Sequence, residues 1–102
     1  MVDDVCALRK GMIAELETVN DYKELMKDCT DHDVKRLFES IIGEELVHVG
    51  EFQYMIEKLC SFSKEKVQEG MKEAEEFTSA DMLSEFWGKP HLFYRQLYRF
   101  MY

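Results

Sequence analysis

Proline and glycine are scarce in this sequence, which has one Pro and five Gly among its 102 residues. An all-β fold needs many tight turns, and this sequence has too few turn-forming residues for one. Hydrophobic residues make up 46% and charged residues 33%, a balance that also argues against disorder. We therefore predict an all-α protein, and a chain of this length predicts one small domain whose apolar surface favours self-association.

Cysteine is also sparse, and long apolar runs are missing. Cys6, Cys29 and Cys60 are odd in number and widely spaced, with no C-x-x-C pair, which argues against a disulfide framework and against a rubredoxin-type or zinc-knuckle site. No stretch approaches the roughly 18 apolar residues of a membrane span, and the first residues lack the pattern of a signal peptide. We expect a soluble cytoplasmic protein with no membrane partner, and delivery into another compartment stays open.

Acidic residues are absent from the last 14 positions, although the chain as a whole carries a net charge of −8. Residues 1–88 hold 21 acidic against 10 basic residues, a net −11, whereas residues 89–102 hold three basic residues and no acid. So acidic a body argues against a nucleic-acid partner. The main interpretation of the acidity is ordinary solubility, and attraction of cations is the lesser one.

Two long stripes of apolar residues, spaced three or four apart, predict two long helices, at about residues 4–28 and 32–60. The short turn Cys29-Thr30-Asp31 between them predicts an antiparallel hairpin, with Thr30 as the cap of the second helix. Gly43 and Gly50 lie inside the second helix, where we expect them to permit close helix approach. The first stripe consists of Val5, Leu8, Met12, Leu16, Val19, Tyr22 and Met26, and the second runs from Val34 to Leu59.

The remainder of the chain predicts shorter helices. A weaker helix is expected at residues 64–77, a short one from Thr78 to about Trp87, and a break at Gly88-Lys89-Pro90. An aromatic and basic segment, residues 91–102, follows and is expected to pack over the bundle or a partner subunit. We predict a single domain over residues 1–102, with a helical hairpin at 1–60 and a C-terminal helical extension at 61–102.

Three residues of metal-ligand type interrupt the apolar stripes. Steps of three and four from Ile41 to Phe52 land on Glu45 and His48, and steps from Leu8 through Met12 to Val19 pass through Glu15. A buried ionisable group is costly unless it is paired or binds metal. Glu15 and Glu45 each lie about 15 residues from the turn, roughly 22 Å along their helices, so the hairpin should bring them level.

Ferritin-like di-iron proteins use one Glu from each of two helices and a Glu-x-x-His from each of two others. This chain supplies half of that set, with a single Glu45-Leu46-Val47-His48, so a two-fold homodimer or larger oligomer would complete a four-helix ferritin-like bundle. In that arrangement Glu45 bridges two irons, Glu15 and His48 are terminal ligands, and open positions admit oxygen or peroxide. The alternative is a dimer interface in which His48 forms a structural salt bridge with one of the two glutamates.

The segment Ala14-Glu15-Leu16-Glu17 through Tyr22, together with Gly43-Glu44-Glu45-Leu46-Val47-His48, resembles the encapsulated-ferritin branch of the ferritin and rubrerythrin superfamily, over roughly residues 5–60. The resemblance implies a ferroxidase whose di-iron centre forms across a dimer interface. It also implies that Glu17 is an iron-entry residue and that Tyr22 is the aromatic beside the centre, a catalytic neighbour. An aromatic of the core is an equally good interpretation of Tyr22. Ala14 and Asp21 depart from the pattern, and residues 92–102 do not clearly match a shell-docking peptide, so an encapsulating shell partner and a free-standing oligomer both stay open.

Other polar residues near these have simpler interpretations. Glu44 and Glu51 step away from the stripe and are expected on a solvated face or behind the ligands, and His32 and His91 carry no clear signal. The leading hypothesis is an enzyme that oxidises Fe(II) for iron storage or detoxification, with manganese as the alternative metal. The other hypotheses are a di-iron protein acting on peroxide or an organic substrate, and a metal-free helical interaction module.

Overall fold

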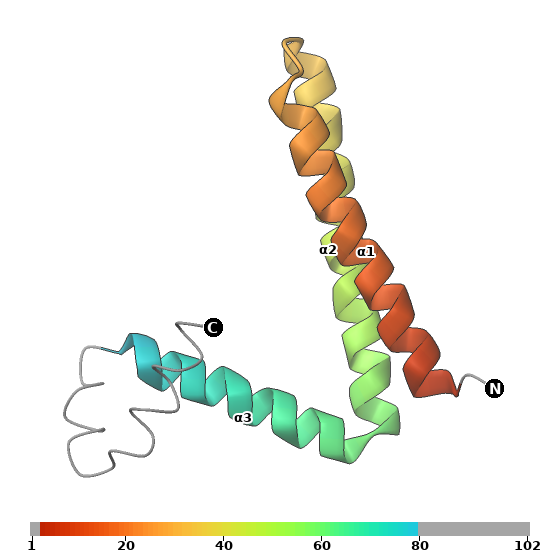
Figure 1. Cartoon of the computed structure of the whole chain (residues 1–102), viewed down its shortest axis with the longest axis vertical. Coiled ribbons are helices and arrows are strands. Elements are labelled where there is room, and N and C mark those ends of the chain that lie inside the picture. The colour runs from red at the N-terminus through yellow and green to blue at the C-terminus, as the bar shows by residue number, and fades with distance from the viewer. Residues whose placement is uncertain (1–2, 80–102) are drawn as a thin grey trace. The chain divides into compact units, whose positions relative to one another are not determined.

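The computed structural model describes residues 3–79, and residues 1–2 and 80–102 lie outside the description. Within that range the chain forms three α-helices and no strand: α1 is Asp4–Lys27, α2 is His32–Leu59 and α3 is Ser61–Thr78 (Figure 1). None of these helices is long and apolar enough to cross a membrane. The prediction of an all-α chain with two long N-terminal helices is confirmed for the described residues.

Aspartate side chains start both long helices. The Asp3 carboxylate accepts a hydrogen bond from the Cys6 amide at 2.7 Å, and the Asp31 carboxylate accepts one from the Val34 amide at 3.0 Å. Each bond satisfies an amide that the first turn of a helix leaves without a backbone partner. The prediction that Thr30 caps α2 is therefore wrong by one residue, because Asp31 occupies the N-cap position and its carboxylate reaches the third residue beyond it.

Helices α1 and α2 lie side by side and antiparallel, joined by the short turn after Lys27 (Figure 1). Val19, Ile42 and Ile56 are buried between them, with Ile56 only 2% exposed. The rings of Tyr22 and Phe38 meet across the same seam, with centroids 5.7 Å apart and planes inclined by 59°. This geometry is favourable for an aromatic pair, and it fixes the register of the two helices near the turn.

Much of the apolar surface of the hairpin stays exposed, because two helices cover only one side of each other. Twelve large apolar side chains among the described residues are exposed. They include Leu37 at 61%, Leu46 at 48% and Met55 at 39%. A small chain with so few buried apolar side chains is a strong candidate for association with other chains.

Gly11 is the glycine of α1 that packs against α2. A Cβ atom at this position would lie 2.8 Å from two atoms of the Phe52 ring, whereas no atom of residues 3–79 lies within 4 Å of a Cβ built at Gly43 or Gly50. The expectation that Gly43 and Gly50 permit close approach is therefore wrong within this chain. Gly11 is not among the apolar residues of the predicted stripe. The packing of α1 on α2 requires a glycine there, because the Phe52 ring occupies the space that a Cβ atom would take.

Helix α3 begins three residues earlier than predicted, at Ser61. The Cys60 sulfur accepts a hydrogen bond from the Ser63 amide at 3.4 Å, which helps to start the new helix directly after α2. The boundary between two compact units falls after Lys64, so the hairpin and the start of α3 belong to one unit and the rest of α3 to the other. A single domain over residues 1–102 stays a prediction, and the helices expected near Trp87 and over residues 91–102 lie outside the described residues.

Candidate metal centre

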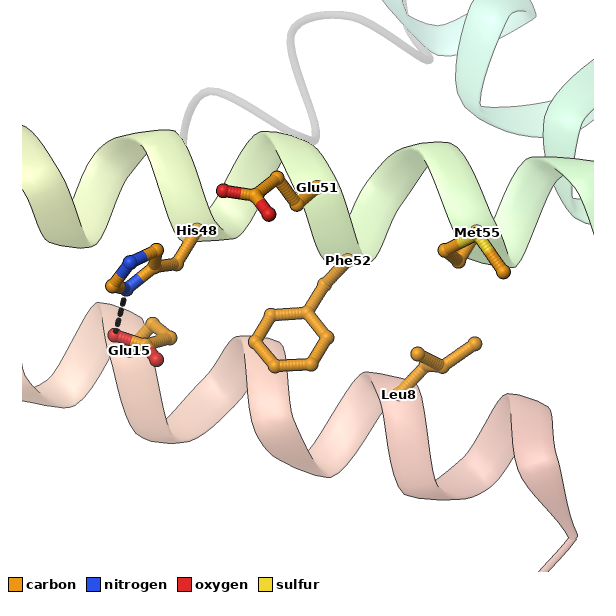
Figure 2. Close-up of a pocket in the computed structure, with 6 residues that line it drawn as sticks. All are labelled: Leu8, Glu15, His48, Glu51, Phe52 and Met55. Carbon is orange, nitrogen blue, oxygen red and sulfur yellow. Dashed lines mark ion pairs between the residues drawn. The ribbon is translucent and has the colours of Figure 1, made fainter.

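The middle of the hairpin brings together the three residues that interrupt the apolar stripes. Glu15 comes from the centre of α1, and Glu45 and His48 come from the centre of α2, one turn apart. His48 Nδ1 lies 3.5 Å from Glu15 Oε2 and 3.6 Å from Glu45 Oε2. Figure 2 shows His48 reaching across from α2 to Glu15 on α1. One ligand atom from each of the three residues lies within 4.8 Å of the others.

These separations are ion-pair distances, and they also suit the ligands of one metal ion. An N–H···O hydrogen bond usually spans about 2.7–3.2 Å, and both distances from His48 Nδ1 are longer than that. Two ligands of one first-row metal ion lie at most about 4.2 Å apart, because each bond is about 2.1 Å long. Both His48 distances fall inside that limit, and small side-chain rotations would bring the whole group within it. Two carboxylates and one imidazole are also ligand types that Fe(II) and Mn(II) accept.

The surroundings of the three side chains differ. Glu15 is 23% exposed and Glu45 19%, because the opposite helix covers them, whereas His48 is 47% exposed. Two partly desolvated carboxylates with one imidazole make a site in which a divalent cation would offset the cost of holding like charges together. The open side at His48 leaves room for further ligands.

A pocket of about 300 Å³ adjoins the group (Figure 2). One end is formed by Glu15, His48 and Glu51, and the other by the apolar side chains of Leu8, Phe52 and Met55. Glu51 was expected on a solvated face or behind the ligands; it is exposed, and it shares this pocket with two of the predicted ligands. Its spacing of three residues from His48 is the sequence signal that could have placed it here.

The remaining candidates lie apart from the three ligands. Tyr22, two turns along α1 from Glu15, is half-buried against Phe38, and its catalytic role stays a prediction. Glu17 is exposed on α1, and its role in iron entry stays a prediction as well. His32 is exposed at the first residue of α2, as a polar turn residue would be, and His91 lies outside the described residues.

Comparison with known proteins finds two relatives. Over 74 residues, 72% of this chain, the sequence is 30% identical to the "Ferritin-like-encapsulin shell fusion protein" of Pyrococcus furiosus. Over 60 residues, 59% of the chain, it is 33% identical to the "Encapsulin nanocompartment cargo protein EncB" of Myxococcus xanthus. The matched regions cover 21% and 38% of those two proteins, so the chain spans much less than the full length of either. No protein-family model matches the chain, and no solved structure matches it.

Proposed function

Because this chain is a distant homologue of the encapsulin-associated ferritin-like proteins, in the encapsulated branch of the ferritin-like superfamily, we propose that it is a ferroxidase that oxidises Fe(II). The observation that carries the proposal is the group formed by Glu15, Glu45 and His48, whose ligand atoms lie within 4.8 Å of one another. Iron is the substrate, and each Fe(II) gives up one electron to oxygen or peroxide. Homology and geometry support the same conclusion independently.

The three side chains would bind iron in different ways. Glu45 stands one helical turn from His48, and in this proposal it would be the carboxylate shared by the two ions. Glu15 and His48, which face each other across the hairpin, would be the terminal ligands. Side chains held on two packed helices keep such a geometry better than residues on loops.

A second copy of the chain completes the centre in this proposal. One chain offers two carboxylates and one imidazole, half of the ligand set of a ferritin-like di-iron bundle. Leu37, His48 and Met55 are separated by 11 and 7 residues, close to whole numbers of helical turns, so they lie along one side of α2. Leu37 and Met55 are exposed apolar residues on that side. A two-fold partner would cover them and bring its own Glu15, Glu45 and His48 to the same place.

The names of the two relatives support a second proposal, association with an encapsulin shell. One relative is described as fused to an encapsulin shell, and the other as cargo of an encapsulin nanocompartment. We infer that this protein too associates with an encapsulin shell and works in its interior, where oxidised iron would accumulate. Co-expression with an encapsulin tests this inference, because the chain should elute with assembled shells on size exclusion. Elution only as a free oligomer would favour a rubrerythrin-like protein that acts outside a shell.

Anaerobic Fe(II) titration tests the metal assignment. About two irons should bind per dimer, and admission of air should oxidise them. Glu45→Ala and His48→Ala should abolish both binding and oxidation. The matched controls are Glu44→Ala, which removes the exposed neighbouring carboxylate, and His32→Ala, which removes the exposed imidazole at the start of α2. Both should behave as the unaltered protein does.

The same titration separates the competing functions. Unchanged stoichiometry in both ligand variants would refute the site. A protein that keeps its dimer and its Tm unchanged when iron is added would be a metal-free helical module. Binding of Mn(II) in preference to Fe(II), without oxidation in air, would assign the site to manganese.

A further inference from the structure

The contact between Gly11 and Phe52 lies beside the proposed metal centre. Gly11 precedes Glu15 by four residues and Phe52 follows His48 by four, so each stands about one helical turn from a ligand. Because the helices are antiparallel, both steps lead towards the same end of the hairpin. Figure 2 shows the Phe52 ring extending from α2 towards α1, between the Glu15–His48 pair and the Leu8–Met55 pair.

Gly11 lets this ring lie directly against the backbone of α1. A Cβ atom on residue 11 would lie 2.8 Å from two carbons of the ring and 3.4 Å from a third. Carbon atoms in favourable contact are about 3.5–4.0 Å apart. An added methyl group would therefore force the ring and the α1 backbone apart by about 0.7–1.2 Å.

Such a displacement is as large as, or larger than, the distance by which the two ligands could separate without rotating their side chains. His48 Nδ1 and Glu15 Oε2 are 3.5 Å apart, and two ligands of one ion can be at most about 4.2 Å apart. Widening the helix spacing by the amount above would take this pair to or beyond that limit. If the ring rotated away instead of the helices separating, it would change the shape of the pocket that it lines together with Glu15 and His48. Either response changes the site.

We propose that Gly11 and Phe52 are positioning residues for the metal centre. The ring, seated on the bare backbone of Gly11, sets the spacing of α1 and α2 one turn from the ligands. It also forms an apolar wall between the ligands and the rest of the pocket. This inference rests on the proposed function, since it concerns the same site. It assigns a specific role to two residues that offer no ligand atom.

Cobalt(II) is a suitable probe, because its visible absorption reports the coordination geometry and needs no turnover. Gly11→Ala should weaken Co(II) binding by about 10-fold or more, the range found for residues that orient metal ligands, and should alter the absorption spectrum. The matched control is Gly50→Ala, the same substitution at a position in α2 where no atom of the described residues lies within 4 Å of the new methyl group. It should bind Co(II) within about twofold of the unaltered protein.

A rescue variant separates positioning from general damage to the fold. Gly11→Ala combined with Phe52→Leu replaces the ring by a smaller side chain and makes room for the new methyl group, so Co(II) affinity and spectrum should return most of the way. If Gly11→Ala alone does not fold by circular dichroism, Phe52→Trp overfills the same contact from α2 and should give the same weakening. Full Co(II) affinity in a folded Gly11→Ala variant would overturn the inference, as would a loss no greater than that of Gly50→Ala.

Failure of the proposed function would look different. In that case the unaltered protein would bind no Co(II), and the positioning role would fall with it. Nuclear Overhauser contacts between the Phe52 ring protons and the Gly11 α-protons, measured in the metal-free protein, would then show whether the ring packs on Gly11 even though the protein binds no metal. Absence of these contacts in a protein that does bind Co(II) would overturn the positioning role alone.

Discussion

Metal binding should stabilise the hairpin by an amount that mass action allows us to calculate. The proposed ligands come from both helices, Glu15 from α1 and Glu45 and His48 from α2, so separating the helices must release the ion. At a free Fe(II) concentration 100 times the Kd, binding to the folded state alone contributes about 2.7 kcal/mol. In a domain of roughly this size each kcal/mol moves the Tm by about 4–8 °C. The expected rise in Tm is therefore on the order of 10–20 °C.

Glu45→Ala should remove that rise while leaving the metal-free protein little changed. Without metal, Glu45 makes no hydrogen bond at ordinary distance to His48, whose Nδ1 is 3.6 Å away, so its loss should cost within about 1 kcal/mol. A structural salt bridge predicts the reverse pattern, in which the metal-free variant is clearly destabilised and iron has no effect on either protein. Glu44→Ala is the control, because it removes an exposed carboxylate one position away.

Anaerobic scanning calorimetry, with and without Fe(II), measures these quantities directly. Each protein is scanned at the same chain concentration, since the Tm of an associating protein depends on concentration. The reasoning is refuted if the unaltered protein shows no rise in Tm, or if Glu45→Ala shows the same rise as Glu44→Ala. A rise in all three would mean that iron binds elsewhere on the chain.

Two further predictions concern association and the core. Leu37→Glu should disrupt the dimer in sedimentation experiments and abolish shared iron binding. Leu46→Glu should do neither, because Leu46 lies nine residues further along α2 and therefore on the opposite side of the helix. Equal effects of the two substitutions would argue against an interface on the His48 side. Ile56→Ala should lower the free energy of unfolding by about 2–5 kcal/mol, because Ile56 is 2% exposed. Ile13→Ala, at a residue 53% exposed, should cost within about 0.5 kcal/mol in the same urea titration, and a similar loss in both would place the core elsewhere.

The hairpin was predictable because its signals are local and periodic. Apolar spacing of three and four residues located both long helices, and the helical rise then placed Glu15 level with Glu45. The exact cap of α2 was harder to predict, since Thr30 and Asp31 are both good capping residues and the backbone conformation decides between them. The early start of α3 comes with a hydrogen bond from the Ser63 amide to the Cys60 sulfur, and cysteine is not a capping residue that a sequence pattern would predict.

Helical spacing does place Gly11 on the inward stripe of α1, three residues after Leu8 and four before Glu15. Spacing does not show which side chain of α2 meets it, because that depends on how the two helices rotate against each other. Gly43 and Gly50 are the expected sites of close approach, yet in the described part of the chain no atom comes within 4 Å of a Cβ at either. Glu51 was missed for a related reason, because a residue beside the apolar stripe can line a pocket that opens at its margin.

A final prediction follows if two copies of the site meet at one interface. Without metal, association would bring together four carboxylates from the two Glu15 and Glu45 pairs, and like charges brought together out of water oppose binding. A divalent cation removes that repulsion and bridges the copies, so metal should tighten the dimer. By linkage, the dimer must then bind metal more tightly than the monomer by the same factor. For coupling of typical size, about 1–3 kcal/mol, that factor is about 5–150.

Sedimentation equilibrium, with and without Co(II), gives the dimer dissociation constant, and Co(II) titrations at several chain concentrations give the metal affinity. The dissociation constant should fall on addition of metal, and the metal affinity should rise with chain concentration until the dimer saturates. The double variant Glu15→Gln, Glu45→Gln removes the charge repulsion and the metal ligands together. It should dimerise at least as well as the unaltered metal-free protein, and Co(II) should not change its dissociation constant. A metal affinity independent of chain concentration would mean that each chain binds its ion alone, and the centre would then not be shared.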